Sequence, residues 1–358
     1  MKNKLAVILP SLAATAPVFV ARDIVNGLVD KGWHVDVFYF SDVVELFDFK
    51  GRTKKISFLS RLNMNEYDVI HSHLFRADLF VYLNNVFSLN GKKKCISTVH
   101  SMVEQDLLDH YGYFLSRFFS FIWIKSWSKI NNLVVLSDIA LNYYRSSLPK
   151  EKNKFIKINN GRNVDPSFIP DDFLTIKETL SKFKLEGKTV IGTCCIVRVL
   201  KGLDQVLKAL VENSNLIFVV IGDGPYLETL QKKAKELQIE KQLISLGRKE
   251  NAFAYMPLFD IYVMPSLSEG FGLALLEAVA MKVPVVCSNL PVFQEIFNDK
   301  EVTFFSLNNI SSLVLAFSVA NKHPEKKEIA FQRYLTKYTV QSMVDNYHNL
   351  FVHVRGNT

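Results

Sequence analysis

Short apolar runs alternate with longer helical patterns along the whole chain. Five runs in the first half have the length and composition of buried strands. They cover residues 5–10, 34–40, 68–72, 94–99 and 132–137. Between the first two runs, residues 16–31 repeat apolar positions with helical spacing, and Gly32 ends the pattern. Strands separated by helices in this way predict parallel βαβ units.

The same alternation restarts after a cluster of turn-forming residues at 157–170. Five further apolar runs predict strands. They cover residues 190–196, 216–222, 242–247, 260–265 and 284–288. The sequence therefore predicts two consecutive α/β domains, residues 1–165 and 166–335, in which ligands bind at the carboxyl ends of the strands.

The length of the chain also favours two domains. Its 358 residues are 49% hydrophobic and 22% charged, which is ordinary for a globular protein but long for one doubly wound sheet. The four cysteines form no C-x-x-C pair, and Cys194, Cys195 and Cys287 lie in apolar, strand-like runs. We expect buried, reduced thiols and no metal site. The first apolar run is too short for a secretory leader, so we expect a cytoplasmic protein.

Positive charge is concentrated in the first half. The formal net charge is +8, and residues 1–165 hold 22 Lys and Arg against 15 Asp and Glu, a balance of +7. This bias suits an anionic substrate or membrane surface; no nucleic-acid-binding motif accompanies it, so we expect no nucleic-acid partner. Residues 111–130 combine many aromatic side chains with Arg117, Lys125 and Lys129. We expect a buried helix there, with an interfacial membrane helix as the alternative.

The strongest candidate for chemistry is the stretch at residues 265–280. An apolar strand ends, a loop containing Gly270 and Gly272 follows, and an apolar helix begins. Glycines let backbone N–H groups approach a ligand closely, and a helix start adds unpaired donors and a positive dipole, which together suit a diphosphate. Glu269 in the loop and Glu277, expected about two turns into the helix, can accept hydrogen bonds from the paired hydroxyls of a sugar or a ribose.

This stretch resembles the E-x7-E motif of retaining GT-B glycosyltransferases, the large family 4 of the sequence-based classification. Further segments carry the similarity along most of the chain. They are Val220-Ile-Gly222-Asp223-Gly224-Pro225, Ser245-Leu-Gly247, Lys201-Gly202, Asn160-Gly161 before Asp165, and the tail at 331–352. The resemblance implies two Rossmann-like domains facing a cleft, with the acceptor on residues 1–165 and the donor on 166–335. Residues 336–358 would form a helix that crosses back to the first domain.

The resemblance also implies roles for individual residues. Glu277 would bind the donor ribose, and Glu269 the hydroxyls of the transferred sugar. Lys201 would neutralise the leaving diphosphate in place of a metal ion, an electrostatic contribution that is often the largest in catalysis. His100, which ends the run at 94–99, would lie near the sugar on the acceptor side, so the catalytic set is Glu269, Lys201 and His100. The remaining donor contacts would come from Arg198, Gly222, Arg248 and the Gly270-Phe271-Gly272-Leu273 backbone, with Arg248 near the nucleobase.

Three positions depart from the family pattern. Ile196 stands where an ungapped match expects an arginine; Arg198, two residues later, would keep the same face of an extended strand. The loop at 11–17 lacks the paired glycines of the family, and Lys282 replaces a glycine, which suits a charged side chain only if it faces solvent. His71 and His73 alternate on one predicted strand, and we expect them to lie on one face of its end rather than to bind a metal.

We therefore expect a glycosyltransferase that needs no cofactor and moves a sugar, with retention, from a UDP- or GDP-sugar to a glycan or lipid-linked glycan. The expected pathway is the synthesis of bacterial surface polysaccharide or lipopolysaccharide, in the cytoplasm, with peripheral contact to an anionic membrane at the inner face of the plasma membrane. Two alternatives stay open. A sugar-nucleotide 2-epimerase would share the fold but release free sugar, and a catalytically degenerate binding subunit would fit the replaced arginine and glycines.

Overall fold

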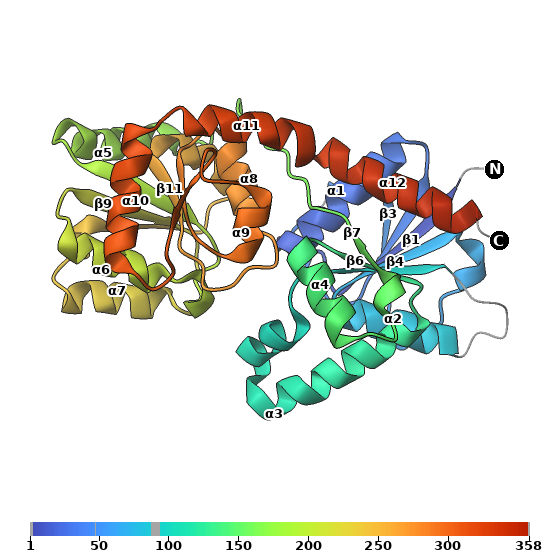
Figure 1. The fold of residues 1–358 in the computed structure, drawn as a ribbon. Helices are drawn as coiled ribbons and strands as arrows, with labels where there is room; N and C mark the ends of the chain where they lie inside the picture. The colour runs from blue at the N-terminus through green and yellow to red at the C-terminus, as the bar shows by residue number, and fades with distance from the viewer. Residues whose placement is uncertain (1–2, 47, 87–93, 357–358) are drawn as a thin grey trace. The chain divides into compact units, whose positions relative to one another are not determined.

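The computed structural model describes residues 3–46, 48–86 and 94–356. Contacts within the chain divide it into two compact units: unit 1 comprises Met1–Arg162 and Tyr338–Thr358, and unit 2 comprises Asn163–Lys337. Each unit is built around a parallel β-sheet with helices packed on it (Figure 1).

The sheet of unit 1 has seven strands in the order β3-β2-β1-β4-β5-β6-β7, all paired in parallel. They are β1 (Lys4–Leu9), β2 (His34–Tyr39), β3 (Arg52–Lys55), β4 (Val69–His73), β5 (Cys95–Val99), β6 (Asn132–Val135) and β7 (Phe155–Lys157). Every residue of the central strands β4 and β5 is buried, whereas every residue of the edge strand β3 is exposed. The sequence pattern did not predict β3 because its four residues are polar.

The described residues of unit 1 form five α-helices. They are α1 (Ala16–Asp30), α2 (Leu74–Val86), α3 (Val103–Ser126), α4 (Asp138–Ser147) and α12 (Val340–Gly356). The last of them comes from the carboxyl end of the chain and packs along α1. Its residues Tyr347 and Phe351 are completely buried. The segment at 331–352 spans two helices, because α11 (Lys326–Lys337) ends in unit 2 before α12 begins in unit 1.

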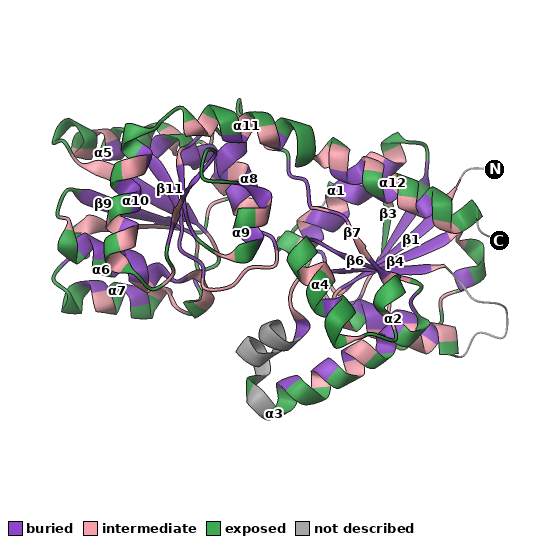
Figure 2. Ribbon diagram, in the orientation of Figure 1, coloured by how far each residue is buried: buried purple, intermediate pink, exposed green. Residues whose placement is uncertain are grey.

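Helix α3 differs from the expectation of a buried helix. One stripe of its second half is buried, including Ser116, Ser120 and Trp123, but the opposite side is exposed (Figure 2). An apolar pattern on all sides does not tell which side a neighbour covers, and here α2 covers only one. Within the described ranges, no helix combines the length and the apolar character that crossing a bilayer requires.

The sheet of unit 2 has six parallel strands in the order β10-β9-β8-β11-β12-β13. They are β8 (Thr189–Cys194), β9 (Leu216–Ile221), β10 (Leu243–Gly247), β11 (Ile261–Met264), β12 (Val285–Ser288) and β13 (Thr303–Phe305). The helices of this unit are α5 (Phe173–Leu185), α6 (Leu203–Glu212), α7 (Leu227–Glu236), α8 (Leu273–Ala280), α9 (Pro291–Ile296), α10 (Ile310–Lys322) and α11. Strand β8 lies between β9 and β11, so the strand order reverses at β8. At such a switch point the loops leave the sheet in opposite directions and open a ligand crevice at the carboxyl ends.

Candidate functional site

The loops that follow β8 and β11 lie side by side at the switch point of unit 2. The Leu267 N–H donates to the carbonyl oxygen of Leu200 at 2.8 Å, and the Gln205 side-chain amide donates to the carbonyl oxygen of Pro265 at 2.8 Å. Gln205 is buried at the start of α6 and joins the two loops from beneath. The positions of Lys201 and Glu269 are therefore fixed relative to each other by the hydrogen bonds between their loops.

Lys201 and Glu269 form an ion pair across these two loops. Lys201 Nζ lies 2.6 Å from Glu269 Oε1, and the Ser266 hydroxyl donates to the same oxygen at 2.8 Å. Burial alone would lower the pKa of Lys201, but the charge of Glu269 and the hydrogen bond to it raise the pKa above its usual value. The Lys201 side chain is 27% exposed and that of Glu269 is 12% exposed, so a cation and a carboxylate meet where a ligand can reach them. Ser266 was not among the site residues predicted from the sequence.

Glycine is required at two of the loop positions. Gly202 has φ 64°, and a Cβ there would lie 2.1 Å from the carbonyl oxygen of Pro265. Gly222 has φ 143°, and a Cβ there would lie 1.8 Å from the carbonyl oxygen of Cys195. The Gly222 N–H donates to the carbonyl oxygen of Gly247 at 2.8 Å. Gly222, a predicted donor contact, therefore serves to bring the loops after β8, β9 and β10 together.

The loop after β11 ends at the start of α8. Gly272 occupies the N-cap with φ 100°, and the side chain of Phe271 is buried, so only its backbone can face a ligand. The helix begins at Leu273, which places Glu277 about one turn along it rather than the expected two. Burial, and then the charge of Glu277, raise the pKa of Cys194 at the end of β8. The Glu277 carboxylate thus lies close to the strand that leads to the Lys201 loop.

Arg198 and Ile196 lie in a loop, not on a strand. Strand β8 ends at Cys194, so the expectation that two residues on an extended strand share a face does not apply directly. Both side chains are nevertheless exposed on either side of the buried Val197. The charge of Arg198 opposes the rise in the pKa of Lys201, which places the guanidinium group in the neighbourhood of the ammonium group. Arg248 is exposed directly after β10.

Lys282 adopts the backbone conformation that explains why glycine is usual at this position. Its φ is 56°, in the left-handed region that L-residues rarely occupy. The side chain is 45% exposed, as expected, and the ammonium group pairs with Glu328 on α11 at 2.9 Å. The ammonium also lies 4.3 Å from the centroid of the Phe331 ring. These contacts offset the cost of the left-handed backbone.

The carboxyl ends of β4 and β5 in unit 1 carry a cluster of histidines. His73 Nδ1 lies 2.8 Å from His100 Nε2, and the rings stack at 5.2 Å between centroids. His71 Nε2 lies 2.8 Å from the hydroxyl of Thr98, which lies 2.8 Å from the hydroxyl of Tyr347 on α12. His71 and His73 do lie on one face, with ring centroids 4.2 Å apart, but sequence reasoning missed that His73 holds His100.

Burial keeps these three histidines neutral. Burial lowers the pKa of His71 and His100 to about 3, and that of His73 well below its usual value. His73 Nε2 is buried and has no hydrogen-bond partner among the described residues. An unpaired acceptor costs less than an unpaired N–H, which favours the tautomer with the proton on His73 Nδ1, donating to His100 Nε2. His100 then carries its own proton on Nδ1 and presents an N–H donor.

The loop at 11–17 is closed by a carboxylate rather than by glycines. The Ala14 N–H donates to Glu45 Oε2 at 2.7 Å, just before α1 begins. Leu12 pairs with Val44 as an isolated bridge and fixes the segment that carries Glu45. A backbone N–H of this loop is thus already bound to the Glu45 carboxylate. In the family pattern, paired glycines would instead let the backbone of this loop approach a ligand closely.

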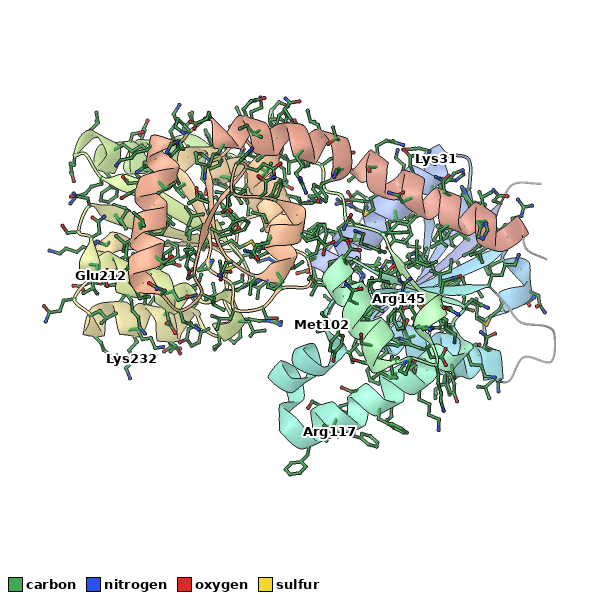
Figure 3. The ribbon with its side chains drawn as sticks, viewed as in Figure 1. Lys31, Met102, Arg117, Arg145, Glu212 and Lys232 are labelled. Carbon is green, nitrogen blue, oxygen red and sulfur yellow. The ribbon has the colours of Figure 1, made fainter. Side chains whose placement is uncertain are left out.

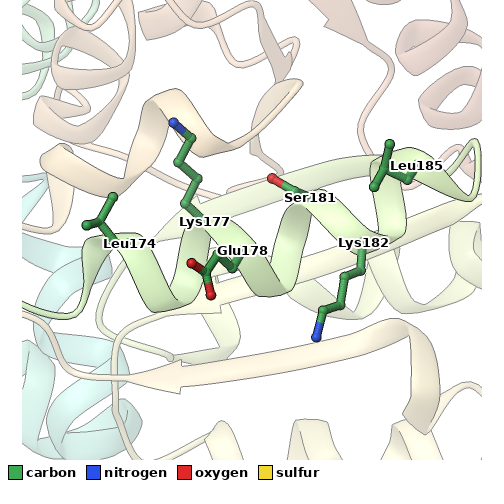
Figure 4. A pocket seen from close by; sticks show the side chains of 6 residues that line it. All are labelled: Leu174, Lys177, Glu178, Ser181, Lys182 and Leu185. Atoms are coloured by element: carbon green, nitrogen blue, oxygen red, sulfur yellow. The ribbon is translucent and has the colours of Figure 1, made fainter.

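Two other features of the described chain lie apart from these residues. Figure 4 shows a pocket lined by six side chains of α5 alone. It includes none of the candidate residues, and Leu174 and Leu185 at its ends are 65% and 88% exposed, so it is the open surface of one helix. In the described part of the chain, no group of three or more His, Cys, Asp or Glu side chains is arranged to hold a metal ion.

Comparison with known families and structures gives a consistent result. The family profile described as "Glycosyl transferases group 1" matches residues 181–331, and that described as "Glycosyltransferase Family 4" matches residues 18–166. The chain is 30% identical over 361 residues to the O-antigen biosynthesis glycosyltransferase WclY of Escherichia coli, covering 97% of this chain and 99% of that protein.

Two further relatives concern the donor and the acceptor. A UDP-Gal:alpha-D-GlcNAc-diphosphoundecaprenol alpha-1,3-galactosyltransferase of Escherichia coli is 29% identical over 117 residues, which cover 31% of this chain and 30% of that protein. The crystal structure of Anabaena Alr3699/HepE in complex with UDP-glucose has a TM-score of 0.81 at 15% identity, with 98% of this chain and 99% of that chain covered.

These matches define the class of protein. The chain belongs to the group 1 glycosyltransferases of family 4, it has their GT-B fold, and it is an enzyme of the transferase class.

Proposed function

We propose that the chain transfers a sugar, with retention, from a UDP-sugar to a lipid-linked glycan during the synthesis of bacterial surface polysaccharide or lipopolysaccharide. The names of the O-antigen enzyme and of the diphosphoundecaprenol galactosyltransferase support this acceptor class. The complex of HepE with UDP-glucose and the UDP-Gal donor in the galactosyltransferase's name favour UDP over GDP. A cytoplasmic enzyme at the inner face of the plasma membrane would suit such an acceptor.

The observation that carries the proposal is the Lys201–Glu269 ion pair at the switch point of the unit 2 sheet. When the donor binds, its diphosphate takes the position opposite the Lys201 ammonium, and Glu269 becomes available to accept hydrogen bonds from hydroxyls of the sugar. The backbone from Gly270 to Leu273 offers N–H groups to the same diphosphate, and Glu277 accepts from the ribose hydroxyls. Arg198 adds a second positive charge, and Arg248 lies beside the nucleobase.

The reaction proposed for this site is a front-face displacement. The bond between the anomeric carbon and the diphosphate oxygen breaks, and the acceptor oxygen forms a bond to that carbon on the same face. The acceptor proton passes to the leaving phosphate oxygen. Lys201, Arg198 and the start of α8 stabilise the charge that develops on the diphosphate, so the proposal requires no metal ion or other cofactor. The Nδ1–H of His100 would donate to a sugar hydroxyl on the acceptor side.

Ligand-dependent stability tests the donor part of the proposal. Thermal unfolding would be followed with UDP, GDP, ADP and their sugar conjugates for the wild-type protein and for Lys201→Ala, Glu277→Ala and the control Lys184→Ala. Lys184 is ion-paired to Asp260, which directly precedes β11, away from the carboxyl ends of the strands. A nucleotide at 100 times its Kd stabilises the native state by about 2.7 kcal/mol.

The expected result is stabilisation by uridine nucleotides in the wild type and in Lys184→Ala, with loss in the other two variants. Absence of stabilisation by every nucleotide would contradict the proposal. With donor and undecaprenyl-linked acceptor, the anomeric configuration of the product, measured by NMR, tests retention. Release of free sugar and UDP without any need for acceptor would instead identify an epimerase.

A further inference from the structure

The second half of helix α3, after the break in the helix at Gly112, carries a row of exposed apolar side chains. Phe114, Phe118 and Phe121 are 85%, 57% and 65% exposed, and Leu115 is 53% exposed. The spacings of four and three residues place the three phenylalanines on one side of the helix. We call these four residues the aromatic face of α3. Figure 3 shows the part of α3 that carries them, with Arg117 labelled.

The opposite side of α3 is held firmly. Phe119 and Trp123 lie 6.0 and 5.5 Å, between ring centroids, from Phe75 on α2. The indole N–H groups of Trp123 and Trp127 donate to the buried Asp78 carboxylate on α2 at 2.7 and 3.0 Å. The aromatic face is thus presented by a helix anchored through its other side, so its exposure does not arise from a detached segment.

The charged residues that follow the start of the aromatic face, up to residue 137, are all basic, whereas the acidic residues of α3, Glu104, Asp106 and Asp109, all precede it. Residues 110–137 contain Arg117, Lys125 and Lys129 but no Asp or Glu. All three basic side chains are exposed. Aromatic side chains enter the boundary between headgroups and acyl chains, and lysine and arginine beside them interact with anionic headgroups.

We propose that the aromatic face of α3 binds the surface of an anionic phospholipid bilayer. The inference rests on the proposed function, because a lipid-linked acceptor is presented at such a surface, and α3 begins three residues after His100. Binding through α3 would hold unit 1, which carries the acceptor-side histidine, at the membrane in which that acceptor is anchored.

A second copy of the chain fits the aromatic face less well. In a two-fold interface the same patch of both copies meets, so the three cations would face an identical set of cations. The four exposed apolar side chains offer roughly 400 Å², about half of the 800 Å² per partner that a stable interface buries. Anionic headgroups neutralise the cations instead.

Vesicle binding tests the proposal directly. The full chain would be sedimented with vesicles of equal parts phosphatidylglycerol and phosphatidylcholine, and with vesicles of phosphatidylcholine alone. We expect binding to the anionic vesicles that weakens with added salt. Phe118→Ser/Phe121→Ser should lower the partition coefficient at least tenfold, because the variant removes two aromatic side chains from the bilayer boundary. Lys125→Glu/Lys129→Glu should remove the preference for anionic vesicles.

The control variant is Leu174→Ser/Leu185→Ser on α5. These leucines are as exposed as the phenylalanines but lie in unit 2. Their replacement should leave vesicle binding unchanged. A fluorescence probe gives a second readout, since the native Trp33, Trp123 and Trp127 are all buried. The emission of Phe118→Trp should shift to shorter wavelength with anionic vesicles, and that of Leu185→Trp should not.

Three results would overturn the proposal. The first is no binding of the wild-type protein to anionic vesicles, and the second is equal binding by Phe118→Ser/Phe121→Ser. The third is a dimer, seen by sedimentation velocity without lipid, that this serine variant abolishes. The third result would assign the aromatic face to a second copy of the chain. Stabilisation by UDP, measured on the same preparations, separates this inference from the proposed donor. Vesicle binding without nucleotide stabilisation would support the membrane surface while contradicting the donor, and the reverse result would overturn the membrane surface alone.

Discussion

In each of the two sheets, polar side chains lie at or just beyond the carboxyl ends of the strands. The environments of these side chains differ between the two units. In unit 1, His71, His73 and Asp78 are completely buried. In unit 2, the side chains of Lys201 and Glu269 lie on loops beyond the strands and are partly exposed. Unit 1 thus uses polar groups to build a fixed scaffold that presents His100, whereas unit 2 leaves a charged pair where a ligand can replace one partner.

The cost of burying charge explains this contrast. Removing a charged group from water is unfavourable unless it is paired and hydrogen-bonded. The histidines of unit 1 avoid this cost because they stay neutral. Burial raises the pKa of Asp78, although hydrogen bonds from Ser72, Trp123 and Trp127 act in the opposite direction. The Lys201–Glu269 pair avoids most of the cost through partial exposure.

The largest expected effect comes from removing the buried carboxylate of unit 1. Asp78→Ala removes the acceptor of two buried indole N–H groups and the shorter of the two hydrogen bonds of the Ser72 hydroxyl, and should lower the free energy of unfolding by about 3–5 kcal/mol. Urea unfolding followed by tryptophan fluorescence reports on unit 1 alone, because Trp33, Trp123 and Trp127 all belong to it. The control in unit 2 is Glu269→Ala, followed by far-UV circular dichroism because the sequence of that unit contains no tryptophan. A loss under about 1 kcal/mol for Asp78→Ala would remove the distinction between the units.

The second effect should appear in activity and not in stability. Lys201→Ala removes the cation proposed to stabilise the leaving diphosphate, and should lower kcat by about 10²–10³-fold. Glu269 keeps the hydrogen bond from Ser266, so the unfolding free energy should change little. Steady-state kinetics beside Lys184→Ala provides the measurement. Equal losses in both lysine variants would show that the ion pair at the switch point has no special role.

Acid should weaken unit 1 through its histidines. The folded-state pKa of His71 and of His100 is lowered to about 3, so below about pH 6.5 the unfolded chain binds protons that the folded chain does not. Stability is therefore complete above that pH and is lost as the pH falls, by about 1.4 kcal/mol per pH unit for each such histidine. The raised pKa of Asp78 opposes part of this loss. Tryptophan-detected melting from pH 8 to pH 5 measures it, and a flat profile would contradict neutral burial.

The smallest expected effect comes from one hydroxyl group. Tyr347→Phe removes only the group that lies 2.8 Å from Thr98, and should lower the free energy of unfolding of unit 1 by about 1 kcal/mol. The ring keeps its packing against His71 and Phe351. Urea unfolding detects such a change. A loss above about 3 kcal/mol would mean that the tyrosine acts through more than this hydrogen bond.

The buried strands and the loop residues were accessible to sequence analysis for physical reasons. Strands such as β9 and β12 are buried on both faces, so they appear as continuous apolar or small runs. Strand β3 consists of four exposed polar residues, and β7 and β13 have three residues each, so no apolar pattern marks them. All four residues of β3 are exposed, so packing requires no apolar side chains there, and charged side chains on an edge strand discourage pairing with another chain.

The residues that complete the candidate site were harder to predict. Ser266 and Gln205 act through single hydrogen bonds that depend on how two distant loops meet. The contact between His73 and His100 depends on the register of β4 against β5. The exposed side of α3 was predicted wrongly, since a pattern that is apolar on all sides contains no information on which side a neighbouring helix covers. Pairwise geometry of this kind arises only after the strands have been ordered in the sheet.

The return of α12 to unit 1 has a consequence for how the protein is made. Unit 2 is one continuous segment, Asn163–Lys337, whereas unit 1 lacks its last helix until residues Tyr338–Thr358 have been synthesised. A Cβ on Gly27 of α1 would lie 2.6 Å from a methyl carbon of Val344, so α12 lies directly against α1 there. On the ribosome, unit 2 can fold as soon as it emerges. The unit that is translated first is therefore the one that completes its folding last.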